Sequence, residues 1–302
     1  MAYLYFPGCS LKGTSRAYDE SLRAVFEALG APLIELEDWN CCGATTYMSI
    51  DERQAFALAA RNLALAEGQN PSPANGAELI APCSACYLVL LKTQKRLATD
   101  ASLGQRISAA LKEEQLCYRG RVRVRHPLDV LVHDIGLQEI SRRVRHPLRG
   151  MRVACYYGCQ IVRPYAPFDN LHRPTTLDDL ARALGAEPVD WALRTYCCGG
   201  SLTGTLPEVG VRLNYLLLKE AQRRGADCII TVCPLCQFNL EAYQDQIRRR
   251  YRDLSSMPVL YFTQLMGLAM GLPPKSLGMQ RLMIPLIQPV GAAEKGGIHE
   301  RA

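Results

Sequence analysis

The sequence predicts an α/β fold of two tandem repeats, each a small parallel sheet with flanking helices. Two observations predict it. Short β-leaning runs alternate with helical patterns, which is typical of right-handed βαβ units and a parallel sheet. One cysteine pattern also occurs twice, once in each half of the 302 residues. Each repeat is too long for a solenoid unit and about right for a small domain.

The first half alternates four β-leaning runs with helical patterns. The runs are Ala2–Phe6, Leu33–Leu36, Glu78–Ala81 and Val122–Val124. A helix is predicted between the first two runs, because apolar residues recur there at helical spacing. These residues are Tyr18, Leu22, Val25, Phe26 and Leu29. Gly30 follows in the C′ position, where helices commonly end.

The second half repeats this alternation. Its β-leaning runs are Arg152–Tyr157, Pro188–Trp191, Cys228–Val232 and Val259–Phe262. Another helix is predicted, with Pro207 suited to its first turn and Gly225 after its end. Its apolar face consists of Val209, Leu213, Leu216, Leu217 and Ala221. We therefore expect one repeat unit over 1–146, a second over 147–272, and a C-terminal tail, 273–302, that is either loosely ordered or docks a partner subunit.

The cysteines define the duplication. Each half has one cysteine, then an adjacent pair followed by glycine, then a C-x-x-C pair. The first set is Cys9, Cys41, Cys42, Cys83 and Cys86, and the second set is Cys159, Cys197, Cys198, Cys233 and Cys236. Corresponding positions are 150 or 156 residues apart, and both adjacent pairs are preceded at a distance by Leu-Gly-Ala, at 29–31 and 184–186. The chain therefore contains an internal repeat.

Three segments of each half are expected to bring their cysteines to one rim. Cys9, Cys41 and Cys83 each come just after a predicted strand, and so do their equivalents in the second half. Ligands of open α/β sheets gather at the carboxyl ends of the strands. The five cysteines of each set are therefore expected to meet around one object.

Cysteine spacing limits what that object is. Structural zinc is closed by four tetrahedral ligands, which leaves a fifth cysteine idle. Neighbouring side chains diverge, so an adjacent Cys-Cys pair serves one small ion poorly, whereas a polynuclear cluster offers several irons. The close four-cysteine run of common ferredoxin modules is absent from the sequence. The spacing favours an unusual iron–sulfur centre, and zinc in one half is the alternative.

The duplicated Cys-x(n)-Cys-Cys-Gly-x(n)-Cys-x-x-Cys pattern resembles the CCG cysteine-rich domain, and the chain resembles the B-type subunit of heterodisulfide reductases (HdrB). The resemblance covers residues 1 to about 272 and is most specific in Ala154–Cys159, Tyr196–Ser201 and Cys233–Leu240. It implies two noncubane [4Fe-4S] clusters, each held by the five cysteines of one set. Gln160 departs from the family, in which relatives often carry His there, so substrate contacts in that pocket stay open.

The chemistry that the resemblance implies is reductive cleavage of a disulfide between the two clusters. Two clusters supply the two electrons that S–S cleavage needs, and Lewis-acidic iron stabilises the thiolate products. The sequence has no G-x-G-x-x-G nucleotide motif, so electrons must be exchanged with partner proteins. In the family these are a ferredoxin-like C-type subunit and a flavin-containing A-type subunit. The family includes a sulfur-oxidising variant, in which a lipoyl-carrier protein presents the sulfur.

Two other functions stay open. The chain also fits a non-catalytic electron-relay or assembly subunit, like the CCG-containing subunit of some succinate or fumarate oxidoreductases, and it fits a zinc-stabilised scaffold. Three cysteines fall outside the sets. Cys117 and Cys228 are interpreted as small buried apolar residues. Cys155, on the strand that leads to Cys159, is interpreted as a structural residue or as one that supports the ligands, not as a ligand itself.

Four arginines, Arg119, Arg121, Arg123 and Arg125, alternate with glycine and valine. Period two predicts that all four guanidinium groups share one face of a strand. Such a face is either an ordinary charged edge strand or a docking surface for an acidic partner or anionic substrate.

Composition excludes several classes of protein. A net charge of +6 with only 6 Phe and 2 Trp provides little of the basic and aromatic surface that single-stranded nucleic acid needs, so no nucleic-acid partner is expected. No apolar run approaches the ~20 residues that span a bilayer. The N-terminus has neither a basic segment nor an apolar segment of a secretory signal, so we expect a cytoplasmic protein.

Overall fold

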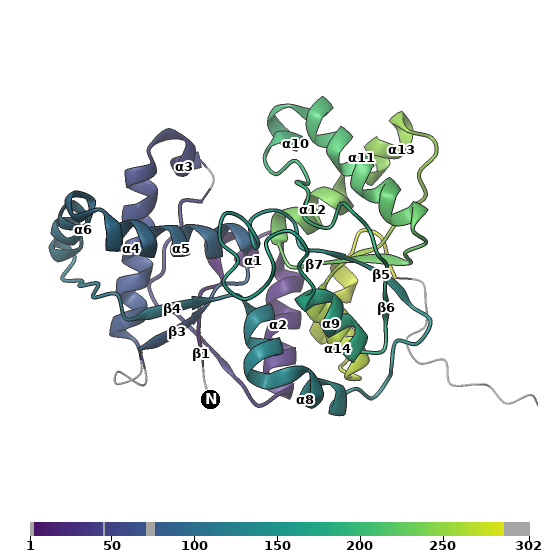
Figure 1. The fold of residues 1–302 in the computed structure, drawn as a ribbon, viewed down its shortest axis with the longest axis horizontal. Coiled ribbons are helices and arrows are strands. Elements are labelled where there is room, and N and C mark those ends of the chain that lie inside the picture. Colours follow the sequence, from purple (N-terminus) through teal and green to yellow (C-terminus); the bar gives the residue numbers. More distant parts are fainter. Residues whose placement is uncertain (1–2, 45, 71–75, 287–302) are drawn as a thin grey trace, which may run out of the picture.

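The computed structural model describes residues 3–44, 46–70 and 76–286. It contains two four-stranded sheets of parallel strands, one in each half, in the orders β2-β1-β3-β4 and β6-β5-β7-β8 (Figure 1). Both orders are the same once the strands of each half are counted from its start. The predicted α/β fold of two tandem repeats is therefore confirmed. Ala2 of the first predicted strand and residues 287–302 of the predicted tail lie outside the described residues.

All four predicted strands of the first half form, and helices connect them. The strands are β1 (Tyr3–Tyr5), β2 (Leu33–Glu35), β3 (Ala77–Ile80) and β4 (Val122–Arg125). The helices before β4 are α1 (Gly8–Lys12), α2 (Arg16–Ala28), α3 (Thr46–Ile50), α4 (Glu52–Gly68), α5 (Ser84–Thr99) and α6 (Ala101–Glu113). After β4 the chain forms α7 (Pro127–Asp129), the π-helix η2 (Val130–Gly136) and α8 (Leu137–Arg142).

The second half repeats the plan. Its strands are β5 (Arg152–Tyr156), β6 (Glu187–Pro188), β7 (Cys228–Thr231) and β8 (Val259–Tyr261). Its helices are α9 (Thr176–Ala183), α10 (Leu202–Thr205), α11 (Pro207–Arg223), α12 (Pro234–Ala242), α13 (Gln244–Arg250) and α14 (Phe262–Ala269). The strand predicted over Pro188–Trp191 is shorter, because the chain leaves the sheet there and the buried Trp191 donates its indole N–H to the Cys155 carbonyl at 3.1 Å.

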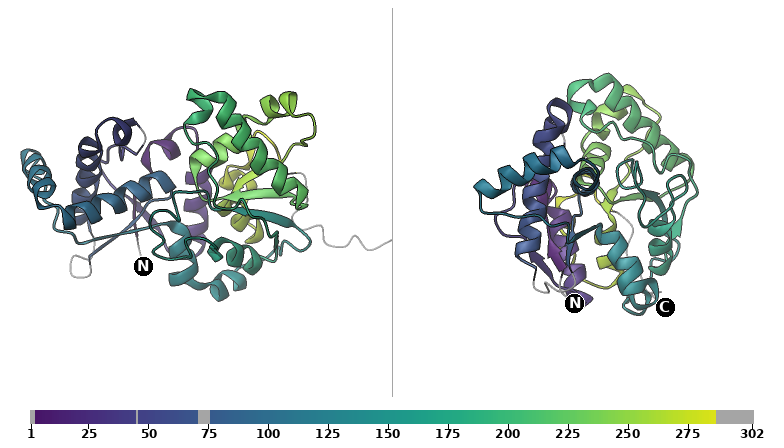
Figure 2. Two further views of the ribbon diagram at one scale, coloured as in Figure 1. Left: turned by 45° about the horizontal axis from the view of Figure 1, so that its top comes forward. Right: turned by 60° about the vertical axis from the view of Figure 1, so that its left-hand side comes forward.

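The two halves pack against each other through α2 and α14, which lie side by side in the centre of the molecule (Figure 1). The Tyr18 ring on α2 stacks on Tyr261 with a centroid separation of 4.3 Å. Buried hydroxyl groups of Ser21 and Thr263 are hydrogen-bonded at 2.7 Å. Figure 2 shows the two halves next to each other from two further directions. One hydrophobic core therefore includes residues of both repeats.

The C-terminal segment after α14 crosses back to the first half. It forms the 3-10 helices η3 (Pro274–Leu277) and η4 (Met279–Arg281). Gly278 has φ +66°, and a Cβ there would lie 2.6 Å from the Ala17 Cα, so only glycine fits this approach. Arg281 forms an ion pair with Glu20 of α2 at 2.6 Å. The first residues of the predicted tail therefore fasten the second half to the first.

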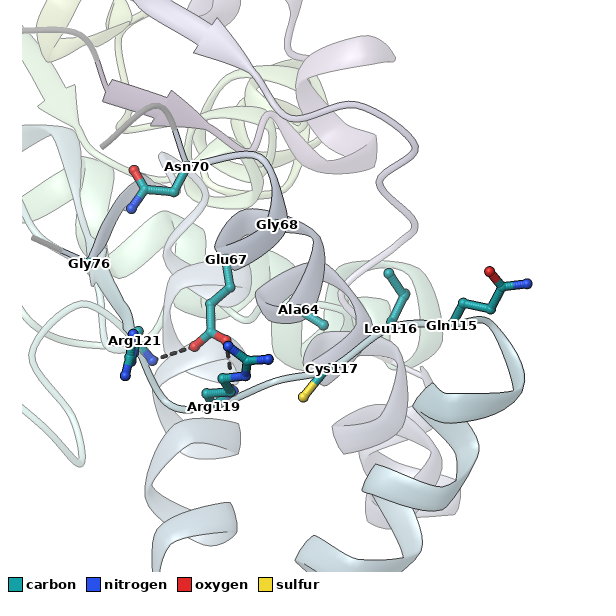
Figure 3. Close-up of a pocket in the computed structure, with 10 residues that line it drawn as sticks. All are labelled: Ala64, Glu67, Gly68, Asn70, Gly76, Gln115, Leu116, Cys117, Arg119 and Arg121. Carbon is teal, nitrogen blue, oxygen red and sulfur yellow. Dashed lines mark hydrogen bonds between the residues drawn. The ribbon is translucent and has the colours of Figure 1, made fainter. Parts of the chain in front are cut away.

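The prediction that four arginines share a strand face is wrong. β4 begins at Val122, so Arg119 and Arg121 precede it, and their backbone N–H groups donate to the Glu67 carboxylate (Figure 3). Arg125 does lie on the edge strand, but its side chain is only 3% exposed. Its guanidinium group contacts carboxylates on three segments, those of Glu78, Asp129 and Asp134. The four residues therefore do not form a common docking face, and the Arg125 side chain instead holds the fold together.

The buried ion network predicts a large effect of one substitution. Arg125→Met should lower the free energy of unfolding by about 3 kcal/mol, because it removes the guanidinium partner of the buried Asp129 carboxylate, which then keeps only the His133 ring at 2.9 Å. Arg123→Met is the matched control, since that side chain is 66% exposed and should change stability by less than about 0.5 kcal/mol. Urea denaturation followed by circular dichroism measures both. Equal effects of the two substitutions would contradict a stabilising network.

Candidate metal centre

The five cysteines of the first set lie at the carboxyl ends of the strands, as predicted. Cys9 follows β1 in α1, and the pair Cys41-Cys42 lies in the loop after β2. Cys83 follows β3 as the N-cap residue of α5, and Cys86 lies in the first turn of that helix. The Sγ atoms of Cys42 and Cys86 are 3.1 Å apart. Three separate segments therefore meet at one end of the sheet.

The second set has the same arrangement. Cys159 follows β5, the pair Cys197-Cys198 lies in the loop before α10, and Cys233 is the N-cap residue of α12. The Sγ atoms of Cys198 and Cys236 are 3.6 Å apart. Asn239, also on α12, directs its amide group to the Cys198 sulfur at 3.5 Å. The prediction that the cysteines lie at the carboxyl ends of the strands is therefore confirmed for both sets.

The two sets meet where the thiols of Cys83 and Cys233 interact across the boundary between the halves. As a result, all ten cysteines follow one another as neighbours in a single row, which we call the cysteine row. It runs Cys9, Cys41, Cys42, Cys86, Cys83, Cys233, Cys236, Cys198, Cys197 and Cys159. Exchanging each cysteine for its equivalent in the other repeat reverses the row. An approximate two-fold axis therefore passes through its centre.

Burial varies along the cysteine row. Cys9, Cys41 and Cys197 are exposed, and Cys159 is half-buried. The six cysteines in the middle are buried. Both ends of the row are thus open to solvent, while the contact between the sets is shielded from it.

Electrostatics favours one thiolate near each end. Hydrogen bonds from the Cys42 and Cys9 thiols lower the pKa of Cys41 to about 2. Hydrogen bonds from Cys159 and Cys198 lower the pKa of Cys197 to about 2. The Gly199 N–H adds a further hydrogen bond to the Cys197 sulfur at 3.3 Å. Since the thiolate is the metal-binding form of cysteine, each set already stabilises that form at the cysteine next to its outer end.

A glycine gives each set room beside a sulfur. Gly8 has φ +67°, and a Cβ there would lie 3.0 Å from the Cys86 Sγ. Gly158, its equivalent, has φ +70°, and its Cβ would lie 3.1 Å from the Cys236 Sγ. A side chain at either position would crowd the sulfur and strain the backbone. The backbone therefore approaches the same sulfur closely in both repeats.

The donor atoms fit a soft transition metal, since they are thiols. Within residues 3–44, 46–70 and 76–286, no three His, Cys, Asp or Glu side chains are spaced to hold one metal ion. The sulfurs follow one another in a row, whereas the ligands of a single tetrahedral zinc converge on one point. Five thiols spread along each half of the row fit a group of several metal atoms better than one ion.

Comparison with known proteins identifies the family. The model of the CCG family, described as a cysteine-rich domain, matches residues 3–91 and 153–241. The chain belongs to the CCG cysteine-rich domain family. These two matched regions contain the two cysteine sets, so the CCG units predicted from the cysteine spacing are confirmed.

Relatives of this CCG protein are subunits of oxidoreductase complexes. The chain is 32% identical over 93% of its length to the 8-methylmenaquinol:fumarate reductase membrane anchor subunit of Wolinella succinogenes, of which it covers 96%. It is 30% identical over 91% of its length to a protein of Archaeoglobus profundus that is like the heterodisulfide reductase B-type subunit, and it covers 92% of that protein. The B-type subunit of a ferredoxin/F(420)H(2)-dependent CoB-CoM heterodisulfide reductase of Methanosarcina acetivorans is 28% identical over 94% of both chains. The resemblance to HdrB is therefore confirmed.

A solved structure supports the fold. A hypothetical protein from Helicobacter pylori matches 94% of the CCG protein with a TM-score of 0.73 at 16% identity. The CCG protein spans about half, 52%, of that longer chain. In the part of the chain that the structure describes, no helix has the length and apolar character needed to cross a membrane.

The cysteines outside the sets differ from one another. Cys155 and Cys228 lie fully buried on β5 and β7, so their structural interpretation agrees with their positions. The prediction for Cys117 is wrong, because this residue is exposed. It lies in the irregular segment before β4 and lines a surface pocket with Glu67 and Arg119 (Figure 3). The apolar neighbours Leu116 and Tyr118 suggested burial, but they did not show that the Cys117 side chain faces away from the core.

Sequence reasoning missed His126, which lies between the two sets. Its buried Nε2 atom is 3.1 Å from the Pro82 carbonyl oxygen and 3.3 Å from that of Val232. These residues immediately precede Cys83 and Cys233. The backbone N–H of Leu128 donates to Nδ1 at 3.2 Å, so the neutral ring carries its proton on Nε2 and donates it to the two carbonyl groups. A single histidine before a proline carries no signal of this role.

His126 predicts a pH dependence of stability. Burial lowers the pKa of His126 to about 4, below the ordinary value of about 6.5. Because the unfolded chain binds this proton more readily, the stabilisation is complete above pH 6.5 and is lost as the pH falls towards 4. Between pH 7 and about 4 the CCG protein should lose about 3 kcal/mol more unfolding free energy than its His126→Gln variant. Urea titrations at both pH values test this, and equal losses would contradict it.

Proposed function

We propose that the CCG protein is the disulfide-cleaving subunit of a heterodisulfide reductase-like complex, with one noncubane [4Fe-4S] cluster in each cysteine set. The observation that carries this proposal is the cysteine row. Two complete sets of five thiols meet at Cys83 and Cys233, and neither half lacks a member. Cleavage of a disulfide needs two electrons, and two adjoining redox centres can provide them together.

The adjacent cysteine pairs support a cluster rather than one zinc ion. Cys41 is exposed while Cys42 is buried, and Cys197 and Cys198 repeat this difference. The two members of each pair therefore point to different surroundings and would bind different metal atoms. When bound, an iron–sulfur cluster supplies electrons one at a time, and its iron acts as a Lewis acid towards sulfur. The chain itself contributes the thiolate ligands and the glycine-lined approach to them.

Exposed apolar residues support access from the side of the exposed cysteines. Tyr196, next to Cys197, is 59% exposed. Ile50 and Leu206 stand at equivalent positions of the two repeats, 156 residues apart, and are 78% and 49% exposed. They lie at the ends of α3 and α10, which face the same edge of the molecule (Figure 1). A carrier-bound or small sulfur substrate would meet an apolar surface there, and a ferredoxin-like C-type subunit and a flavin-containing A-type subunit would exchange the electrons.

A second candidate is an electron relay without disulfide chemistry. The 32% identity to a subunit of an 8-methylmenaquinol:fumarate reductase favours it. In a relay the same cysteine row would carry two clusters in series, from one exposed end to the other. Both candidates need both clusters, but only the first needs a sulfur substrate.

Metal content tests the shared part of both candidates. Anaerobically prepared protein should contain about eight irons with comparable sulfide, as expected for two four-iron clusters. Cys42→Ser and Cys198→Ser should each remove one of two signals in electron paramagnetic resonance (EPR) and about half of the iron, because each removes a buried thiol of one set. Cys117→Ser, outside both sets, is the control and should retain all iron. Zinc in place of iron, or both signals retained in each set variant, would refute the ligand assignment.

Turnover separates the reductase from the relay. With an artificial one-electron donor, the loaded protein should cleave a disulfide, and Cys42→Ser and Cys198→Ser should each reduce the rate to background. The physical reason is that one remaining centre supplies only half of the required electrons. Thiol release measured under anaerobic conditions gives the rate. Activity surviving in one variant would disprove the paired mechanism, and a loaded protein that is reduced by a quinol but cleaves no disulfide would favour the relay.

A further inference from the structure

The Nε2–H group of His126 lies between the two repeats and is within hydrogen-bond distance of a backbone carbonyl group from each. Pro82 and Val232 are equivalent residues, 150 positions apart, and each precedes the inner cysteine of its set. The His126 Nε2 atom lies at nearly the same distance from both carbonyl oxygens, 3.1 and 3.3 Å. The imidazole N–H group therefore lies on the approximate two-fold axis, beside the contact between Cys83 and Cys233.

Only one repeat can supply a donor at this position. Strand register makes Tyr261 the equivalent of His126, because Arg125 pairs with Ile80 and Leu260 pairs with Ile230. Both residues are N-cap residues, of α7 and α14 respectively. Two copies of one side chain cannot occupy one point on an axis. The Tyr261 side chain accordingly stacks on Tyr18, and its hydroxyl group is 3.3 Å from the Gln237 amide oxygen.

The surroundings of His126 fix the ring in place. Phe168, from the irregular segment between β5 and α9, stacks on the imidazole at a centroid separation of 6.5 Å and an interplanar angle of 13°. Tyr87 meets the ring edge-on from α5, at 5.8 Å. The ring is fully buried, and the Leu128 N–H group occupies Nδ1. The imidazole can therefore neither rotate freely nor give its Nε2 proton to solvent.

Two other side chains of the first half also contact the Val232 carbonyl group that His126 binds. The Val232 carbonyl oxygen also lies 3.4 Å from the Tyr18 hydroxyl group and 3.5 Å from the Ser84 hydroxyl group. Three side chains of the first repeat thus hold the backbone that carries Cys233. The His126 ring is the one of these three that also holds the Pro82 carbonyl before Cys83.

We propose that His126 is a positioning residue that fixes the separation of the two cysteine sets and so controls the exchange of electrons between their redox centres. This inference rests on the proposed function, which places a cluster in each set. The shared N–H group ties together the two peptide groups that lead into Cys83 and Cys233. Without it, only the longer contacts of the Tyr18 and Ser84 hydroxyl groups with the Val232 carbonyl remain beside the inner cysteines. The inner ends of the sets are then held less tightly, and the interaction between the two centres weakens.

Two substitutions separate this role from the capping of α7. In His126→Asn the amide oxygen can still accept the N–H group of the first turn, but the short side chain cannot reach both carbonyl groups. In His126→Gln the longer side chain places its amide N–H near the position of Nε2, while its capping ability is poor. Asparagine therefore retains the cap without the link, and glutamine restores the link without a good cap.

The first measurement is the magnetic interaction of the two reduced clusters, read from the splitting of their EPR signals. All three proteins should contain about eight irons, as two clusters require. The splitting should fall clearly in His126→Asn and return towards the wild-type value in His126→Gln. Unchanged splitting in His126→Asn would overturn the proposal. Equal loss of iron or of splitting in both variants would also overturn it, because it would show a general structural role.

The second measurement needs no cluster. Diamide takes up two hydrogen atoms as Cys83 and Cys233 join in a disulfide, which peptide mass spectrometry quantifies in the metal-free full chain. The Cys42–Cys86 disulfide, within one half at a sulfur separation of 3.1 Å, is the internal reference. The ratio of the two should be up to about tenfold lower in His126→Asn, the effect of losing one hydrogen bond, and should recover in His126→Gln. Equal ratios in all three proteins would overturn the proposal, whereas the expected ratios in a protein that binds no iron would overturn the proposed function alone.

Discussion

The contact between Cys83 and Cys233 is the constraint on which the rest of the structure depends. Each residue is the N-cap of the helix that follows a central strand, β3 or β7. Helix N-termini favour negative charge, and hydrogen bonds from Cys236 and Cys83 hold the pKa of the Cys233 thiol well below its usual range. The two N-cap cysteines meet only if the halves are held in one orientation. The stacked Tyr18 and Tyr261 rings, the buried Ser21–Thr263 pair and the returning C-terminal segment supply that orientation.

Local sequence patterns were enough to predict the strands and the two long helices α2 and α11. The eight strands of the described residues were predicted from short β-leaning runs, and the helices α2 and α11 from apolar spacing with glycine or proline at their ends. The rule that ligands gather at strand carboxyl ends placed both cysteine sets correctly. The packing of one half on the other has no periodic signature, so the single cysteine row and the position of His126 could not be predicted. The alternating pattern wrongly predicted that Arg119 and Arg121 lie on the strand. They precede it, and the Glu67 carboxylate accepts hydrogen bonds from their backbone N–H groups.

Duplication explains where the two repeats must differ. Residues on either side of the axis can be kept in both copies, as the cysteines and the glycines at 8 and 158 are. A side chain that reaches the axis competes with its own equivalent for the same space. His126 and Tyr261 show the consequence: one side chain takes the axial position, and the other turns away to stack. Each of the two side chains stacks on a ring from the other half, Tyr261 on Tyr18 and His126 on Phe168, and the Tyr18 hydroxyl group also donates across the boundary to Val232.

The distribution of burial along the cysteine row links the two candidate functions. A buried centre protects the interaction between the sets from solvent, and a low local dielectric strengthens polar interactions there. Exposed ends let substrates or partner proteins reach each set separately. A relay uses these ends in sequence, whereas a reductase requires that one substrate draws on both centres at once. In each case the proposed clusters would exchange electrons across the same short contact between Cys83 and Cys233, beside the two carbonyl groups that His126 holds.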